Sequence, residues 1–514
     1  MKKIILSAAF ALITFCASAA FGDIFSEMYL NYLVMDDDAS TDYPKVWVIG
    51  PSSAGSTQPN ISLSIPTAVT HDGVTYRVTQ IDAKAFSGKT NIVQAFIGYG
   101  ITHIGNEAFK GCSKLENVRI PSSIQSIGDN AFASCSALKE VNIANDDPST
   151  FTTSASAFPS NSDMTLGVAK TNDLRTVTAF NNLSQYSKFA TIELSSAAYD
   201  FTTDDSFAMC VTKAPSKNVP GEVKLVGVFG NSTGAFAPKA TYTHSVYSYK
   251  LVATGFRSCK DQTQIKSFDF SNATNLTTID CYTFSGCTNL TSVNLGSTVG
   301  HIELYAFENV PISSITIPKS VNYIGYLAFN KCPNLSAISV EANHQCFKSS
   351  YGVLYKSLGD GEWNLLCCPA AFPYAAFYEY MFPSQVTVID SYAFAFCTNL
   401  KTIHIPYGVQ KLKDYLFNAA LQEVKIPGSV SEFDADAFGN ASGLQRIFIN
   451  ITTPPTITLF PATPANLYVP YGFVSNYKSA AFWKNCVNIQ DGSYDVPEAC
   501  TKTVSGTLLN DVRS

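Results

Sequence analysis

The fold is decided by residues 104–121, which read Ile-Gly-Asn-Glu-Ala-Phe-Lys-Gly-Cys-Ser-Lys-Leu-Glu-Asn-Val-Arg-Ile-Pro. Residues 127–143 repeat the pattern as Ile-Gly-Asp-Asn-Ala-Phe-Ala-Ser-Cys-Ser-Ala-Leu-Lys-Glu-Val-Asn-Ile. The step from Phe109 to Phe132 is 23 residues. A fixed period of this length is typical of a solenoid, in which each repeat is one coil that buries its apolar edge only against its neighbours. The sequence therefore predicts a repeat scaffold.

The Phe of this pattern recurs along the chain, usually after a small residue. Where the repeats are contiguous, the steps are 23, 23, 23, 22, 23 and 21 residues. An alternating run such as Ile315-Thr-Ile317-Pro318 follows, which predicts a short strand with one apolar face, ended by proline. We expect these strands to pair between coils into a parallel sheet, with a spacing of roughly 4.8 Å. The positions are Phe86, Phe109, Phe132, Phe256, Phe284, Phe307, Phe329, Phe394, Phe417 and Phe438.

These residues resemble the BspA-like leucine-rich repeats found on surface proteins of bacteria and some protozoa. The signature runs L-x-x-V-x-I-P-x-S-V-x-x-I-G-x-x-A-F-x-x-C, and residues 115–135 and 312–332 match it closely. The period and the resemblance together predict an α/β-type repeat solenoid with leucine-rich repeat arrays of parallel strands. The resemblance implies adhesion to host matrix proteins or to other cells.

Breaks in the period suggest two modules. After Ile143 we expect the first array to stop, and residues 165–196 have the plan of strand, short helix-like run and strand. Residues 467–489 have the same plan, so both segments are predicted end caps. Alternating strands separated by turn-rich loops precede Phe86 and Phe256, and they predict short β-rich N-terminal caps.

The repeat period and its breaks divide the chain into segments. The segment 341–385 contains a glycine-rich turn at Gly359-Asp-Gly-Glu362 and is predicted to be a hairpin insertion within the second module. The tail 493–514 has no period, which is compatible with disorder. The predicted segments are a signal peptide at 1–22, a first leucine-rich repeat module with caps at 23–196, a second at 197–450, a C-terminal cap at 451–492, and the tail.

The N-terminus predicts export. Met1-Lys2-Lys3 is followed by an apolar run too short to span a bilayer and by small residues suited to cleavage. Lipid anchoring at Cys16 is an alternative, but Phe15 stands where such sites favour a small residue. No other apolar run is long enough for a membrane span, so we expect a secreted or surface-attached mature chain without a transmembrane segment.

Six cysteines, starting with Cys112 and Cys135, lie three residues after a repeat Phe. Other repeats place Val310, Ala420 or Ala441 at that offset, which a disulfide or metal site would not tolerate. The pattern therefore predicts buried free thiols. We expect any pairing among the cysteines outside the pattern, which are Cys346, Cys367 and Cys368.

The sequence offers no clear catalytic, metal-binding or cofactor-binding set, and we predict a protein that is not an enzyme. Gly230-Asn-Ser232-Thr-Gly234 matches the spacing of a hydrolase nucleophile, but no helix pattern follows it. The histidines show no metal-ligand spacing, and the acidic runs fit no calcium loop. A net charge of −6, with 14% charged residues, gives no nucleic-acid footprint.

The remaining candidate surface is the row of residues that point outward from the strands. In the first module this row contains Arg119 and Asn142. Towards the end of the second it combines aromatic and basic groups of the kind enriched at binding hot spots. The candidate ligand-binding residues are His404, Lys425, Arg446 and Phe448, with Phe448 expected to be exposed.

Two functions fit these observations. The first is a non-catalytic binding or adhesion scaffold for an extracellular protein or glycan, with host matrix proteins among the partners that the resemblance implies. The second is a structural component of an envelope or surface layer without a specific ligand.

Overall fold

The computed structural model describes residues 22–36, 43–53, 59–161, 163–170, 175–195, 197–204, 206–216, 218–230, 233–458 and 466–492. The chain forms two compact units, residues 1–229 with 240–258 and residues 230–239 with 259–514. The predicted signal peptide, apart from Gly22, and the predicted disordered tail lie outside the described residues. The predicted boundary between modules at 196/197 is based on the repeat pattern. It stays a prediction, separate from the division into these two units.

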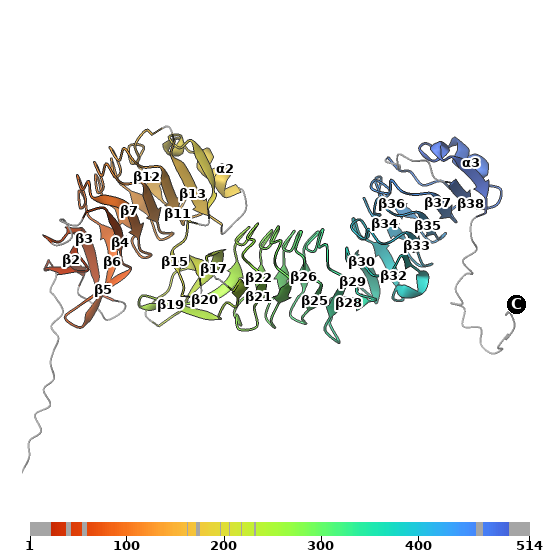
Figure 1. Cartoon of the computed structure of the whole chain (residues 1–514), viewed down its shortest axis with the longest axis horizontal. Helices are drawn as coiled ribbons and strands as arrows, with labels where there is room; N and C mark the ends of the chain where they lie inside the picture. The colour runs from red at the N-terminus through yellow and green to blue at the C-terminus, as the bar shows by residue number, and fades with distance from the viewer. Residues whose placement is uncertain are drawn as a thin grey trace, which may run out of the picture. The chain divides into compact units, whose positions relative to one another are not determined.

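In the first unit, each coil of the array contributes one short strand to each of two sheets, in which the strands of successive coils pair parallel. One sheet has the order β1-β2-β3-β6-β8-β10-β12, with β5 beside β6, and the other has the order β14-β13-β11-β9-β7-β4 (Figure 1). The bounds in the first sheet are β1 Ile24–Glu27, β2 Leu30–Asp36, β3 Lys45–Pro51, β5 Ala68–His71, β6 Val74–Ile81, β8 His103–Ile104, β10 Ser126–Ile127 and β12 Thr152–Thr153. Those in the second are β4 Ile61–Ile65, β7 Ile92–Ile97, β9 Asn117–Ile120, β11 Glu140–Ile143, β13 Thr165–Ala169 and β14 Thr191–Ser195.

A column of phenylalanine rings fills the space between the two sheets. Phe86, Phe109 and Phe132 are buried, and their ring centroids are 5.0 and 5.1 Å apart in succession. The repeat places one ring per coil, so each ring is covered by the coils before and after it. This confirms the predicted core position of the repeat Phe.

The first array does not stop after Ile143, so this prediction is wrong. Ala157 and Phe158 form a further coil, and the Phe158 ring stacks on Phe132 at 5.3 Å. The period lengthens to 26 residues here because a turn is inserted, in which Asn145 Nδ2 donates a hydrogen bond to Thr150 Oγ1. The predicted cap follows this coil, with β13, α2 (Arg175–Asn181), the 3-10 helix η1 (Ser184–Tyr186) and β14.

Residues after 197 begin a second antiparallel meander within the first unit. Strands β15 and β16 pair antiparallel with each other, β16 pairs antiparallel with β17, and β17 then pairs parallel with β20. Strands β1, β2, β3 and β6 follow the same plan, which supports the predicted β-rich caps. The bounds are β15 Phe201–Thr202, β16 Phe207–Lys213, β17 Gly221–Val228, β19 Thr241–His244 and β20 Tyr247–Thr254.

The second unit repeats the coil architecture. Phe284, Phe307 and Phe329 stack at 5.3 and 5.6 Å, and all three are buried. The strands of these coils are β18 Ala235–Phe236, β21 Ser267–Asp269, β22 Thr278–Ile279, β23 Ser292–Asn294, β24 His301–Ile302, β25 Ser314–Ile317, β26 Tyr323–Ile324 and β27 Ala337–Val340.

The predicted hairpin insertion is a third meander of the same kind. Strands β28 (Phe347–Ser350), β29 (Val353–Gly359) and β30 (Glu362–Cys367) pair antiparallel, and β30 then pairs parallel with β32 (Val386–Ile389). The hairpin is confirmed, but it also opens a further array. This array continues in the same sheet through β34 (Lys411–Leu412) and β36 (Glu432–Phe433).

The fold is a parallel-strand solenoid with little helix, so the α/β label is replaced by a mainly β description. The α-helices with described bounds, α2 and α3 (Val474–Ser479), are seven and six residues long. The remaining 3-10 helices are η2 (Glu379–Met381) and η3 (Trp483–Asn485). Within the described part of the chain, no helix is long and apolar enough to cross a membrane.

The bend cysteines are buried free thiols, as predicted. Their Sγ atoms also donate hydrogen bonds to backbone carbonyls of the preceding coil, from Cys135 to Phe109 at 3.2 Å and from Cys332 to Phe307 at 3.0 Å. Cys346, Cys367 and Cys368, where we expected any pairing to occur, are also free. Cys16 and Cys500 lie outside the described residues.

Truncating a ring in the middle of the column should destabilise the second unit strongly. We expect Phe307→Ala to lower the free energy of unfolding by about 3–5 kcal/mol, because both neighbouring coils lose the contact. Thr316→Ala, at an exposed position of β25, is the control and should cost less than about 0.5 kcal/mol. Chemical denaturation measures both, and a loss below about 1 kcal/mol for Phe307→Ala would contradict its core position.

Alkylation of the native protein should separate the two classes of thiol. Burial raises the pKa of Cys332 to about 12, whereas Cys346 is only half-buried. Because the thiolate is the reactive form, iodoacetamide should label Cys346 at least about tenfold faster than Cys332. Peptide mass spectrometry measures both rates, with denatured protein as the reference. Equal native rates would argue against the buried bend.

Candidate functional site

The candidate residues lie on one parallel sheet of the second unit, called here the ladder sheet. Its order is β31-β33-β35-β37-β38-β39. His404 pairs in register with Lys425, which pairs in register with Phe448. The structure therefore places these three side chains in one row across neighbouring strands. The bounds are β31 Ala376–Phe377, β33 Thr402–His404, β35 Glu423–Ile426, β37 Arg446–Ile449, β38 Asn466–Val469 and β39 Asn488–Asp491.

The row continues beyond Phe448 to Tyr468 on β38. The two rings stack with centroids 4.4 Å apart and planes 10° apart. On the other side, Lys425 Nζ lies 5.6 Å from the centroid of the Phe448 ring. Phe448 is consequently half-buried, and the expectation that it is exposed is wrong. The row presents a continuous cation–aromatic surface rather than a single protruding ring.

A second row, two residues earlier on β35 and β37, contains an acidic and a basic side chain. Glu423 pairs in register with Arg446, and Arg446 Nε donates a hydrogen bond to Glu423 Oε2 at 2.7 Å. His404 Nε2 lies 3.3 Å from Glu423 Oε1, and its Nδ1 lies 3.5 Å from Glu379 Oε1. Two of the predicted residues, His404 and Arg446, are thus joined through the Glu423 carboxylate, which fixes their side-chain positions.

Both carboxylates are held in the charged form. Burial by itself would raise the pKa of Glu423, but hydrogen bonds from Arg446 and His404 hold it below the ordinary value. Burial would likewise raise the pKa of Glu379, but the hydrogen bond from His404, a backbone hydrogen bond and the charges of His404 and Lys425 together lower it. The Glu423 side chain is only 14% exposed, so these bonds act in surroundings largely shielded from water.

Tyrosines extend the surface beyond the predicted residues. The Tyr378 ring meets His404 edge-on at 4.9 Å, and Tyr380 stacks on Tyr378 at 5.8 Å. We define the ladder face as Tyr378, Glu379, His404, Glu423, Lys425, Arg446, Phe448 and Tyr468.

Sequence reasoning missed four members of this face. The alternation that selected Lys425 could also have selected Glu423, which lies two residues earlier on the same strand. Tyr468 stands at the equivalent place in the predicted cap strand. Tyr378 and Glu379 follow β31 inside the segment 341–385, where the repeat pattern gives no register.

The predicted row of the first array is not an open surface. Arg119 is covered by Tyr199, whose ring centroid lies 3.7 Å from the guanidinium carbon, and Arg119 Nε donates to Ala197 O at 3.1 Å. Asn142 is buried. Nearby, the buried Asp200 accepts hydrogen bonds from Ser122 N and Oγ, both at 2.7 Å. The chain after β14 thus packs over this face, and the first array offers no equivalent site there.

The ladder face combines aromatic rings, two basic side chains and two carboxylates. Among the described residues, no group of His, Cys, Asp and Glu side chains is arranged to hold a metal ion. Part of the Gly230–Gly234 motif, including Ser232, lies outside the described residues. The side chains of the ladder face can stack, form ion pairs and take part in hydrogen bonds.

A sequence profile of the BspA type leucine rich repeat region matches the chain in six copies, over residues 72–185, 255–352 and 368–460. No curated protein sequence matches the chain.

Three solved structures are among those to which the chain is similar. A leucine rich cell surface protein from Faecalibacterium prausnitzii is 18% identical, with coverage of 92% of this chain and 95% of that one and a TM-score of 0.36. A leucine-rich repeat protein from Bacteroides ovatus is 19% identical; the match covers 82% of this chain and 94% of that one, with a TM-score of 0.33. The pneumococcal vaccine antigen PcpA is 15% identical; the match covers 93% of this chain and 100% of that one, with a TM-score of 0.33.

The charge network should make stability depend on pH in a defined direction. Because the pKa of Glu423 is lowered from 4.5 in the folded state, its stabilising effect is complete above pH 4.5 and is lost as the pH falls through the folded value. At pH 7 we expect Glu423→Gln to be less stable by about 1 kcal/mol.

Denaturation of the wild type and this variant between pH 7 and pH 3 should show the difference shrinking towards low pH. Glu432→Gln is the control, because the Glu432 side chain is 66% exposed and should contribute little. A difference that is independent of pH would contradict a role for the Glu423 charge.

Proposed function

Since the chain belongs to the BspA-type leucine-rich repeat family, we propose that it is a non-catalytic binding or adhesion scaffold that uses the ladder face. The proposed ligand is an extracellular protein or glycan, with host matrix proteins as the first class to test. The proposed location is outside the cell, by secretion or at the outer surface, as the N-terminal pattern of residues 1–22 predicts. Lipid anchoring at Cys16 is the less favoured route.

The observation that carries this proposal is the register of His404, Lys425 and Phe448 on three adjacent strands. Parallel pairing at roughly 4.8 Å brings side chains from coils more than twenty residues apart onto one surface. Aromatic and arginine side chains are the residue types most enriched among binding hot spots. The Tyr468 ring and the half-exposed Arg446 extend the same surface.

The rigidity of the surface supports the same conclusion. The ladder face rests on a sheet whose inward residues Ile403, Val424 and Ile447 are fully buried. Glu423 hydrogen-bonds Arg446 and also contacts His404, so both side chains are positioned before any ligand arrives. Such preorganisation reduces the entropy that binding would otherwise lose.

Binding to a panel of purified matrix proteins and to a glycan array should depend on the ladder face. We expect Lys425→Ala/Arg446→Ala/Phe448→Ala to weaken binding at least about tenfold, as for loss of a hot spot. The matched control replaces Asp269, Asn294 and Thr316, which hold the outward position on β21, β23 and β25, by Ala. Lys425→Ala/Arg446→Ala, which keeps the Phe448 ring, separates loss of binding from loss of folding.

Two results would count against the proposal. Ligand binding that survives in both ladder-face variants would remove this surface from consideration. If the wild-type chain bound no member of either panel, the structural envelope or surface-layer role would be favoured instead.

A further inference from the structure

A second aromatic surface lies elsewhere on the second unit, and nothing in the proposed function uses it. We name it the tyrosine stripe and define it as Tyr282, Tyr305, Tyr326, Tyr392 and Tyr415. The first pair of rings stacks at 4.9 Å and the last pair at 5.2 Å. Tyr326 meets Tyr392 edge-to-face at 5.9 Å, and its backbone carbonyl accepts a hydrogen bond from Tyr305 N at 3.3 Å. Tyr326 is 45% exposed, so the stripe reaches the surface.

The backbone beneath the stripe is unusual for tyrosine. Tyr282, Tyr305, Tyr392 and Tyr415 have φ values of 56°, 54°, 60° and 51°. This left-handed region is unfavourable for bulky side chains, and short polar residues are enriched there. Each of the four lies two residues before the core Phe of its coil. The left-handed conformation is therefore a property of the coil.

The first array has the same turn but fills it differently. Lys84, Glu107 and Asn130 occupy the position with φ of 60°, 58° and 54°. Lys84 and Glu107 form an ion pair at 3.9 Å, which gives this position a balanced polar surface. In the second unit, Leu327 holds the same place with a φ of 55°. A solenoid therefore does not need tyrosine at this turn, and its recurrence points to surface recognition.

Acidic residues outnumber basic ones beside the stripe tyrosines in the sequence. Five carboxylates lie within three residues of a stripe tyrosine, whereas Lys413 is the one basic residue in that range. Lys413 Nζ is paired with Asp390 Oδ1 at 2.9 Å, and Tyr415 donates a hydrogen bond to Asp436 at 3.1 Å. The carboxylates are Asp280, Glu303, Glu308, Asp390 and Asp414.

Two tyrosines of the stripe have raised pKa values. Burial, and then the neighbouring Tyr392, Tyr305 and Asp390, raise the pKa of Tyr326 to about 12. The pKa of Tyr305 is raised by burial and by neighbours that include Tyr282 and Glu308. In both cases burial is the largest cause, and the neighbouring groups add to it.

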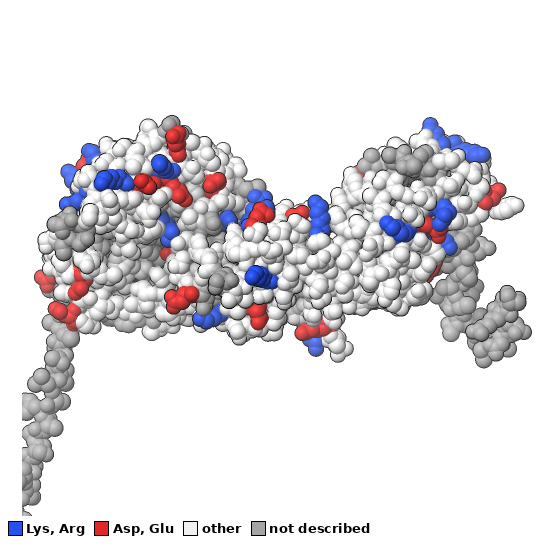
Figure 2. Space-filling model, viewed as in Figure 1, with Lys and Arg blue, Asp and Glu red and all other residues white. Residues whose placement is uncertain are grey.

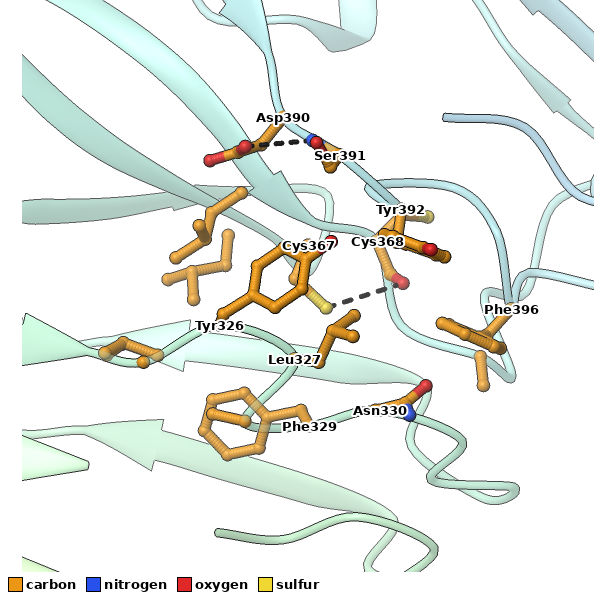
Figure 3. A pocket seen from close by; sticks show the side chains of 16 residues that line it. Tyr326, Leu327, Phe329, Asn330, Cys367, Cys368, Asp390, Ser391, Tyr392 and Phe396 are labelled. Carbon is orange, nitrogen blue, oxygen red and sulfur yellow. Dashed lines mark hydrogen bonds between the residues drawn. The ribbon is translucent and has the colours of Figure 1, made fainter. Parts of the chain in front are cut away.

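The middle of the stripe contains a small cavity. Tyr326, Tyr392 and Phe396 line it together with Asp390 and Cys367 (Figure 3). Its volume is about 40 Å³, which suits water rather than a ligand group. A partner would consequently lie along the rings. The Tyr392 ring stacks on Tyr415 and Phe396, with centroids 5.2 and 6.4 Å away, so the more exposed Tyr326 ring offers the larger contact surface.

We propose that the tyrosine stripe binds an extended, arginine-rich polypeptide segment. Guanidinium groups stack on aromatic rings, donate hydrogen bonds to phenol oxygens and pair with carboxylates, so one ligand class satisfies each group present. Arginine is favoured over lysine because its planar, weakly hydrated head stacks on rings. Over the face of the molecule in Figure 2, acidic and basic side chains are interspersed, so bulk charge alone does not select this partner.

The test uses a fluorescently labelled nona-arginine peptide and anisotropy at about 150 mM salt, where long-range attraction is screened. We expect the full chain to bind it at least about threefold more tightly than nona-lysine. Tyr305→Leu/Tyr392→Leu should weaken binding about tenfold, and Leu is accepted at this turn because Leu327 already occupies it. Asp280→Asn/Glu303→Gln should weaken it about fivefold.

The matched control is Tyr471→Leu, because Tyr471 is 88% exposed and lies outside the stripe. Its affinity for nona-arginine should equal that of the wild type. Thermal unfolding of each variant checks that the second unit remains folded. A ladder-face variant should keep its nona-arginine affinity, so this proposal and the proposed function can fail separately.

Three outcomes would overturn the proposal. The first is no nona-arginine binding by the folded wild-type chain. The second is equal affinity for nona-arginine and nona-lysine with no effect of the tyrosine changes, which would mean unspecific charge attraction. The third is self-association that the tyrosine changes abolish and nona-arginine does not compete with, which would make a second copy the occupant.

Discussion

The stacking of one phenylalanine per coil is the interaction on which the structure depends. Phe109 lies about one strand spacing from both Phe86 and Phe132, with ring centroids 5.0 and 5.1 Å away. A single coil cannot bury such a ring, so each coil is stable only through its neighbours. The cysteine thiol of the bend adds a hydrogen bond between coils, as from Cys135 to Phe109 O. The column therefore sets the spacing and the register of everything outside it.

A fixed register converts repeated positions into continuous surfaces. Tyrosine at one turn position in four coils makes a stripe, and aromatic or basic residues at one strand position make a row. The two surfaces differ in chemistry because the ladder face includes Lys425 and Arg446, whereas carboxylates surround the tyrosines. A repeat protein can thus carry separate recognition surfaces without disturbing its core, because the core uses other positions of the same coil.

Packing outside the repeat decides which of these surfaces remain open. In the first array, Arg119 occupies the outward position that His404 and Lys425 occupy later, yet Tyr199 covers it. Asp200 reinforces this closure by accepting hydrogen bonds from Ser122 and from Val211 N at 2.6 Å. Burial raises the pKa of Asp200 to about 6, in keeping with its enclosed position. Equivalent strand positions therefore have different accessibility.

The sequence by itself determined the coil, because a period of 23 residues with Phe, Cys and an alternating strand has one stable solution, in which every coil buries its ring. It also determined which strand residues face outward, since alternation fixes the side of the sheet, and it located His404, Lys425, Arg446 and Phe448. Only the tertiary structure decided that the first array continues through Phe158, that the segment 341–385 opens a third array, and that Arg119 is covered. These outcomes depend on contacts between segments far apart in the chain, and no periodicity within one repeat encodes such contacts.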